Sequence, residues 1–173
     1  CVDYDHFNFS DSSLEKALKE KIKWKSEERY LVYLGSLGTW YMLDEMLRLF
    51  SSLKKKDDRF HFLLFTPDSP AHAFDCARKY NLEDSIRVMR LDRKEVPQAL
   101  KLCHLAVSFI LPSFSKLSSS PTKVGEYLAT GLPVIANGGV GDMEELFQNP
   151  AVGVLVKDFE PASLEQAASS ALN

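Results

Sequence analysis

Hydroxyl, ammonium and carboxylate side chains gather in one short segment, SSSPTKVGEYLA, which begins with the serines Ser118, Ser119 and Ser120. A proline follows the serines, and the pattern after it is typical of a helix with Lys123 in its first turn. A lysine at that place opposes the helix dipole, which favours a bound anion nearby. Glu126 lies on a similar face one turn further on, where we expect it to be exposed in a cleft and its carboxylate can accept hydrogen bonds from a diol. The segment therefore predicts a site for a ligand that carries phosphate and hydroxyl groups.

Purely structural interpretations explain the same residues. Ser120 is expected to be the N-cap of this helix, with Pro121 at its first position. This interpretation gives Ser118 and Ser119 no structural role. Lys123 and Glu126 also have the spacing of a surface ion pair between positions i and i+3. The spacing alone does not decide between an ion pair and a ligand site.

Two glycine-bearing loops have a comparable chemistry. The first, GSLGTWY, follows an apolar strand and opens a helical pattern, and its candidates for binding an anion are Gly35, Ser36, Gly38 and Thr39. Its spacing is neither GxGxxG nor that of a P-loop, so a tight turn is the alternative. The second loop, NGGVGD, spans 137–142 and again brings backbone amides close to the start of a helix. In this helix Asp142 and Glu145 have the spacing of a capping box.

The elements around these loops alternate between strand and helix. Short apolar runs predict strands at 29–35, 60–66, 85–91, 105–111, 132–137 and 153–156. Helical periodicity predicts helices at 13–24, 40–55, 71–80, 94–103, 121–131, 142–147 and 161–172. This alternation is typical of the α/β class: a Rossmann-like, doubly wound parallel sheet of about six strands with helices on both faces. Ligands bind such sheets outside the carboxyl ends of the strands, where all three loops are expected.

The composition excludes several classes of protein. The chain has 173 residues with a net charge of −3, and its one run of lysines, 54–56, is followed by two aspartates, so we interpret it as a solvated helix end. Nucleic acid is therefore not expected as a partner. The three cysteines are irregularly spaced, without a CxxC pair, which favours a reduced, cytoplasmic environment and no metal site. No apolar run approaches the roughly 20 residues of a membrane span.

Beyond these local patterns, most of the chain resembles the donor-binding half of retaining glycosyltransferases of the GT-B class, family four. The most specific part is SSPTKVGEYLATGLPVIANGGVGDMEEL, followed by VGVLVKDFEPASLEQA. The stretches VDYDHF, YLGSLGTWYMLDEML and EVPQALKLCHLAVSFILPS also resemble that family in order and spacing. The resemblance implies that 1–173 is a single nucleotide-sugar-binding domain, the C-terminal half of a GT-B fold, and a fragment of a longer chain.

The resemblance also assigns roles to particular positions. It implies that Glu126 holds the ribose hydroxyls as the second carboxylate of a Glu–seven residues–Glu motif, and it places Ser118 where the first carboxylate would stand. The family's arginine and lysine on the donor diphosphate correspond to Ser36 and Tyr41 here. Lys123 and the serine hydroxyls are therefore expected to take over part of the phosphate binding. Ser118 and Lys123 are the candidates for a catalytic role.

The function implied is transfer of a sugar from a nucleotide-diphosphate sugar to a glycan or lipid-linked acceptor, in bacterial surface polysaccharide synthesis. The resemblance implies no cofactor, and we expect no metal ion. The acceptor, and any peripheral contact with the inner face of a membrane, would belong to an N-terminal domain that this chain lacks. The alternatives are a GT-B-type sugar-nucleotide epimerase and a degenerate, non-catalytic nucleotide-sugar-binding domain.

Overall fold

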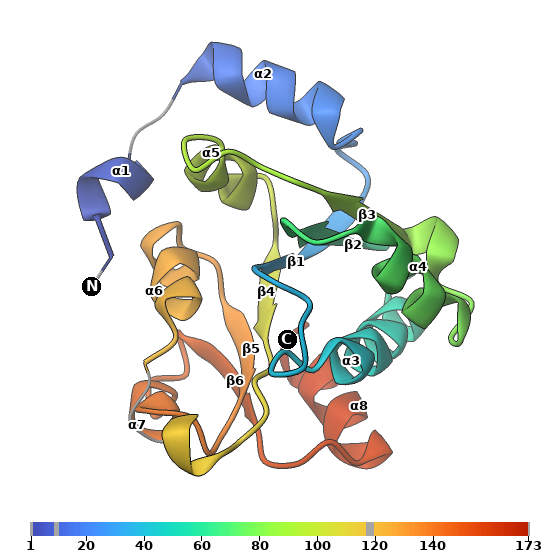
Figure 1. Ribbon diagram of the computed structural model, residues 1–173, viewed down its shortest axis with the longest axis vertical. Helices are drawn as coiled ribbons and strands as arrows, with labels where there is room; N and C mark the ends of the chain where they lie inside the picture. The colour runs from blue at the N-terminus through green and yellow to red at the C-terminus, as the bar shows by residue number, and fades with distance from the viewer. Residues whose placement is uncertain (1, 9–10, 117–119, 173) are drawn as a thin grey trace.

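A computed structural model of the chain describes residues 2–8, 11–116 and 120–172, and Figure 1 shows one sheet surrounded by helices. Six parallel strands form the sheet in the order β3-β2-β1-β4-β5-β6. The strands are β1 (Arg29–Leu34), β2 (Phe60–Phe65), β3 (Ile86–Met89), β4 (Leu105–Ser108), β5 (Val134–Asn137) and β6 (Gly153–Val156). This order, with β1 and β4 in the middle, is that of a doubly wound sheet, as predicted.

The helices are shorter than the sequence pattern predicts, but all seven predicted ones are present. The helices are α1 (Tyr4–Asn8), α2 (Ser12–Lys21), α3 (Leu43–Lys56), α4 (Pro70–Arg78), α5 (Val96–Lys101), α6 (Thr122–Ala129), α7 (Met143–Leu146) and α8 (Pro161–Ser170). Two 3₁₀ turns, η1 (Glu83–Ser85) and η2 (Phe114–Lys116), complete the described elements. The run of lysines at 54–56 lies in the last turn of α3, as predicted.

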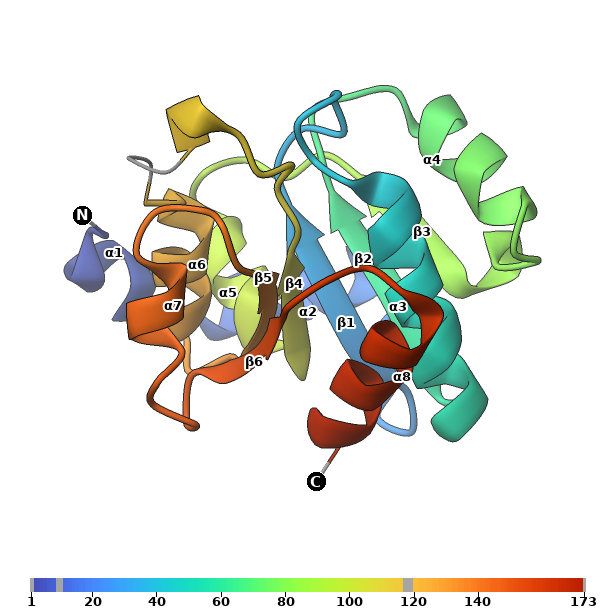
Figure 2. The same ribbon diagram turned by 90° about the horizontal axis from the view of Figure 1, so that it is seen from below.

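Helices cover both faces of the sheet (Figure 2). One apolar core lies between the sheet and α3, α4 and α8, and a second lies between the sheet and α1, α2, α5, α6 and α7. The central strands therefore bury both of their faces, which explains why they read as continuous apolar runs in the sequence. The largest side chains of β1 belong to opposite cores, Tyr30 to the second and Tyr33 to the first.

Helix starts differ from their predicted positions. Helix α6 begins at Thr122 with Pro121 as its N-cap and without a capping side chain, so the prediction of Ser120 as N-cap was wrong. The Ser120 hydroxyl instead donates to Asp142 at 3.5 Å. The predicted capping box of α7 was also wrong, since Asp142 occupies the N-cap position without a side-chain bond to the helix.

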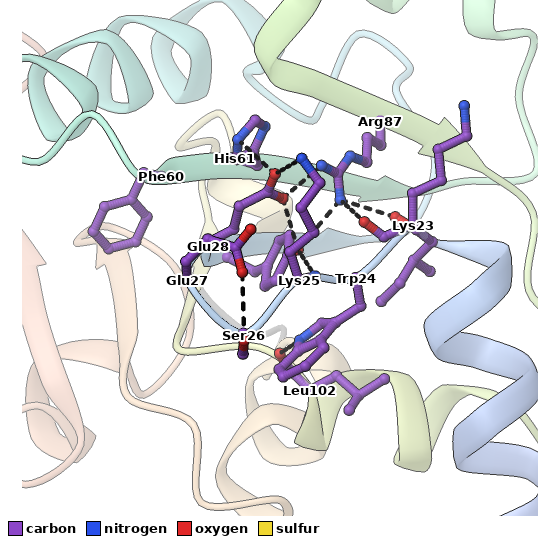
Figure 3. Close-up of polar contacts among 12 residues, drawn as sticks. Lys23, Trp24, Lys25, Ser26, Glu27, Glu28, Phe60, His61, Arg87 and Leu102 are labelled. Atoms are coloured by element: carbon purple, nitrogen blue, oxygen red, sulfur yellow. Dashed lines mark hydrogen bonds and ion pairs between the residues drawn. The ribbon is translucent and has the colours of Figure 1, made fainter.

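A cluster of charged side chains covers the amino-terminal end of the sheet, opposite to the carboxyl ends of the strands where the three loops are expected (Figure 3). Glu28 lies at its centre and is only 7% exposed; its carboxylate accepts hydrogen bonds from Tyr30, Arg87 and Lys25. Arg87 also donates to the carbonyl oxygens of Ile22 and Lys23 just after α2. These contacts fasten α2 to β1 and β3, far along the strands from the three loops of interest.

Among the described residues no helix is long and apolar enough to cross a membrane. Cys76 and Cys103 are buried free thiols, and burial raises the pKa of both. His104, the neighbour of Cys103, accepts a hydrogen bond from the backbone N–H of Tyr30 at 3.2 Å. We therefore assign His104 a structural role.

Candidate functional site

The loops after β1, β2 and β3 line an open pocket of about 270 Å³ at the carboxyl ends of these strands. This is the edge of a doubly wound sheet at which ligands bind. Its lining comes from the three strand ends and from the start of α5: Leu34, Gly35, Phe65, Thr66, Pro67, Arg90, Leu91, Arg93 and Val96. Helix α6, which carries Lys123 and Glu126, stands beside this pocket and is tied to β1 because Tyr127 accepts a hydrogen bond from the Leu34 N–H at 2.8 Å.

Lys123 lies against the glycine turn that follows β1. Its ammonium donates to the Tyr33 hydroxyl at 3.0 Å and lies 4.3 Å and 4.0 Å from the ring centres of Tyr33 and Tyr41. It approaches Gly35 so closely that a Cβ atom there would lie 2.8 Å from the lysine nitrogen. Burial lowers the pKa of Lys123 to about 7, although the Glu126 carboxylate acts in the opposite direction.

Tyr41 occupies the position at which the resemblance places a lysine, and the ammonium of Lys123 lies over its ring. The group that can carry a positive charge at the glycine turn is therefore Lys123, which comes from α6 and not from the turn itself. Desolvated cations are stabilised by the faces of tyrosine rings, so the two rings hold this charge in place.

Glu126 is 8% exposed, and its partner is Arg93, whose guanidinium donates to the carboxylate at 2.5 Å. The expectation that Glu126 is exposed was therefore wrong. The alternative of a surface ion pair with Lys123 was also wrong: in the described part of the chain, the ion pair of Glu126 is the one with Arg93. Arg93 lines the pocket, so Glu126 is linked to the pocket through this ion pair.

The glycine turn offers fewer free amides than expected. The backbone N–H of Gly35 donates to the Phe65 carbonyl, and that of Leu37 donates to the Asp68 carboxylate. Helix α3 begins only at Leu43, so the prediction that the turn opens the helix directly was wrong. Gly35 has a φ of +136°, which L side chains rarely adopt, and Ser36, Gly38 and Thr39 are exposed beyond it.

The reason for the late helix start is a contact between the loops after β1 and β4. Tyr41 and Ile110 form an isolated antiparallel bridge, and Leu111 donates its N–H to the Trp40 carbonyl at 2.9 Å. Residues 40–42 therefore run beside the loop after β4 before α3 begins. The two loops approach each other at the upper edge of Figure 2.

The third loop, at 137–142, is braced by side chains. The buried Asn137 amide accepts from the Ile110 N–H and donates to the Ile110 carbonyl, which joins the ends of β4 and β5. Glu144 accepts a hydrogen bond from the Gly139 N–H at 2.6 Å. This amide is thus already paired. Ser118 and Ser119 lie outside the described residues, and Ser120 is exposed.

The sequence interpretation missed two arginines, Arg90 and Arg93. Both follow β3 and both line the pocket. Arg90 falls within the predicted strand 85–91, and Arg93 falls in the short polar connection that follows it. The feature that could have identified them is their position near the end of a strand, because every loop after a strand of a doubly wound sheet is a candidate for ligand binding.

The chain matches the protein family described as "Glycosyl transferases group 1" over residues 15–173. No curated protein matches it by sequence. Among solved structures, it is similar to a glycosyltransferase from Rickettsia africae ESF-5, with a TM-score of 0.78 and 20% identity over 99% of this chain and 45% of that one. Because the identity is this low, the likeness concerns the fold alone.

Two further solved glycosyltransferases are similar to this chain in fold. HepE from Anabaena, in complex with UDP and glucose, has a TM-score of 0.77 and 15% identity over 99% of this chain and 46% of that one. WaaG, which is involved in lipopolysaccharide biosynthesis, has a TM-score of 0.75 and 14% identity over 98% of this chain and 45% of that one. This chain therefore spans less than half the length of these proteins. The Rossmann-like sheet matches one domain of a GT-B glycosyltransferase, and the chain belongs to the group 1 glycosyl transferases.

Proposed function

We propose that this chain is the donor-binding domain of a retaining glycosyltransferase that uses a nucleoside diphosphate sugar. The observation that carries the proposal is the placement of Lys123 and Glu126: α6 holds the ammonium against the glycine turn and the carboxylate against Arg93, which lines the adjacent pocket. A cation suits a diphosphate and a carboxylate suits a ribose diol. The two groups are thus arranged for the two polar parts of a nucleoside diphosphate.

The difficult step in such a reaction is departure of the leaving group. The bond between the anomeric carbon and the diphosphate oxygen breaks, and negative charge develops on the diphosphate. A positive group already fixed in a partly desolvated site stabilises this charge. Lys123 has that role in our proposal, with the hydroxyls of Ser118, Ser119 and Ser120 as further donors. The proposal includes no metal ion.

Ser36 is exposed in the turn where the resemblance places an arginine, so the positive charge at the turn comes from Lys123. We place Ser36, Gly38 and Thr39 around the diphosphate, since all three are exposed in the turn. This role leaves out the amides of Gly35 and Leu37, which already donate within the protein.

The acceptor is a glycan or a lipid-linked sugar in the proposal, and the process is synthesis of a bacterial surface polysaccharide in the cytoplasm. The similarity in fold to WaaG supports this process, and the similarity to HepE with UDP and glucose supports the donor class. The acceptor would be held by a second domain, because all six described strands belong to the one sheet that forms the donor site.

Titration with nucleosides, nucleoside diphosphates and nucleotide sugars tests the proposal. If Lys123 binds the diphosphate as a charged group, Lys123→Ala is expected to weaken UDP or GDP binding about tenfold or more and to leave nucleoside binding nearly unchanged. A Lys123→Ala variant that binds the diphosphate as wild type does would contradict the proposal. Lys101→Ala, on the exposed end of α5, removes the same charge elsewhere and serves as the control.

A non-catalytic domain is the second candidate, and one observation favours it. In the described structure the charged groups of Lys123 and Glu126 already have partners, namely two tyrosines and Arg93. Assays of sugar transfer and sugar isomerisation with a chain that includes the second domain separate the candidates. Binding without either reaction would favour the non-catalytic one, and isomerisation would favour an epimerase.

A further inference from the structure

Arg93 makes contacts on two sides, although its side chain is 61% exposed. On one side its guanidinium donates to Glu126 on α6 at 2.5 Å. On the other side it lies 5.3 Å from the ring centre of Phe7, a fully buried residue of α1. Its carbonyl oxygen is 3.2 Å from a ring nitrogen of His6. Arg93 is therefore a bridge between the helix of the candidate ribose site and the segment at 2–8.

The same segment packs directly on α6. A Cβ atom added to Gly125 would lie 2.5 Å from a methyl carbon of Val2, so the absence of a side chain at Gly125 is what admits Val2. Gly125 stands between Lys123 and Glu126 on α6. The segment therefore touches the site helix at the position next to Glu126. Figure 1 shows α1 beside α6 and α5.

We infer that Arg93 is a positioning residue: it fixes the Glu126 carboxylate and ties the segment at 2–8 to α6, so that the ribose site is complete only with this segment in place. The inference rests on the proposed function for its ligand, a nucleoside diphosphate. A carboxylate that is 8% exposed needs a partner, and Arg93 is the partner that the structure supplies. One carboxylate oxygen pairs with the guanidinium, which leaves the other to accept from a ribose hydroxyl.

The first experiment needs no ligand: hydrogen exchange of the peptide at 2–8 in four variants. Arg93→Gln and Glu126→Gln are each expected to speed exchange about two- to fivefold, and the double variant no more than the larger single effect, because both remove the same bridge. Arg78→Gln is the matched control, since it removes an exposed ion pair with Asp75 on α4. Unchanged exchange in Arg93→Gln, or fully additive effects in the double variant, would overturn the inference.

A steric experiment tests the same link without changing any charge. Gly125→Ala is expected to displace the segment at 2–8 and to speed its exchange, because the new methyl group overlaps Val2. Adding Val2→Ala removes the overlapping methyl carbon and is expected to restore slow exchange. Slow exchange in Gly125→Ala alone would show that the segment does not depend on this contact.

The last experiment compares UDP with 2′,3′-dideoxyuridine diphosphate, which lacks the ribose hydroxyls. Arg93→Gln is expected to weaken UDP binding about tenfold and to leave the dideoxy compound nearly unaffected, with partial recovery in Arg93→Lys. Equal losses for both compounds would overturn the positioning role, because they would place Arg93 on the base or the phosphates. If wild type binds neither UDP nor GDP, the proposed function fails, and the exchange experiments still decide the role of Arg93.

Discussion

At the scale of single residues, Lys123 is subject to two opposing effects. Burial disfavours its charged form and lowers its pKa to about 7, whereas the rings of Tyr33 and Tyr41 stabilise the ammonium. The unfolded chain holds this proton up to a pKa of about 10.4. Between these two pH values the unfolded state binds more protons than the folded state, so stability rises with pH there.

Lys123→Met is expected to remove this pH dependence. Relative to the variant, the wild-type free energy of unfolding should rise with pH between about 7.5 and 9.5, by at most about 1.4 kcal/mol per pH unit. Urea denaturation at several pH values measures the difference. Parallel curves for the two proteins would show that Lys123 keeps an ordinary pKa. Lys16→Met, at an exposed position of α2, is the matched control.

Gly35 and Gly38 provide a second test, because they differ in space and in backbone conformation. Gly35 has a φ of +136° and a Cβ there would lie 2.8 Å from the Lys123 nitrogen, whereas a Cβ at Gly38 meets nothing within 4 Å. Gly35→Ala is therefore expected to cost about 1–3 kcal/mol of unfolding free energy and to weaken diphosphate binding. Gly38→Ala should change neither the free energy of unfolding nor the free energy of diphosphate binding by more than about 0.5 kcal/mol. Equal effects of the two substitutions would contradict this account of the turn.

The residues of the site were predictable only in part. Helical spacing placed Lys123 and Glu126 on one helix, and the structure agrees. The partners of both residues come from elements far away in sequence: Tyr33 from β1 and Arg93 from the loop after β3. Spacing along the chain carries no information on such contacts, which is why Glu126 was expected to be exposed.

At the scale of elements, the cluster around Glu28 fastens α2 to the amino-terminal end of the sheet. Burial alone would raise the pKa of Glu28, but hydrogen bonds from Tyr30, Lys25 and Arg87 outweigh it and lower the pKa to about 2. A carboxylate with a depressed pKa stabilises the fold above its unfolded pKa of about 4.3. This contribution is lost as the pH falls through 2.

Glu28→Gln is therefore expected to destabilise the protein by roughly 2–3 kcal/mol at pH 7 and to have a progressively smaller effect between pH 4.3 and 2. Chemical denaturation at these pH values measures it. Glu165→Gln is the control, because its ion pair with Lys56 is long, at 3.9 Å, and Glu165 is 69% exposed. Nucleotide binding by the folded Glu28→Gln protein should be unchanged. A binding defect would mean that the cluster communicates with the site.

The central strands were predicted well because they are mostly apolar runs between breakers, and burial of both faces requires such runs. Helix starts were predicted poorly, because tertiary contacts decide them. Residues 40–42 have helical periodicity but pair with the loop after β4. The short α1 was also not predicted. Its five residues are held mainly by packing on α5 and α6, which a local sequence pattern does not reveal.

At the scale of the whole molecule, one sheet holds the candidate donor site. Sugar transfer also requires an acceptor hydroxyl within about 3–3.5 Å of the anomeric carbon, in line for attack. In the described ranges, all six strands belong to the one sheet and helices cover both of its faces. We therefore expect these 173 residues to bind the donor without transferring its sugar. Transfer by this chain alone would place the acceptor site within it.

The central claim is that Glu126 and Lys123 hold the ribose and the diphosphate of one nucleotide. Calorimetric titration of the wild-type chain with UDP, GDP and ADP, repeated with Glu126→Gln, tests it most directly. We expect one of these nucleotides to bind with a dissociation constant of about 10–1,000 µM. Glu126→Gln should weaken binding by about 1.5–3 kcal/mol while the thermal melt confirms a folded protein. Absence of binding by wild type, or equal affinity in the folded variant, would contradict the claim.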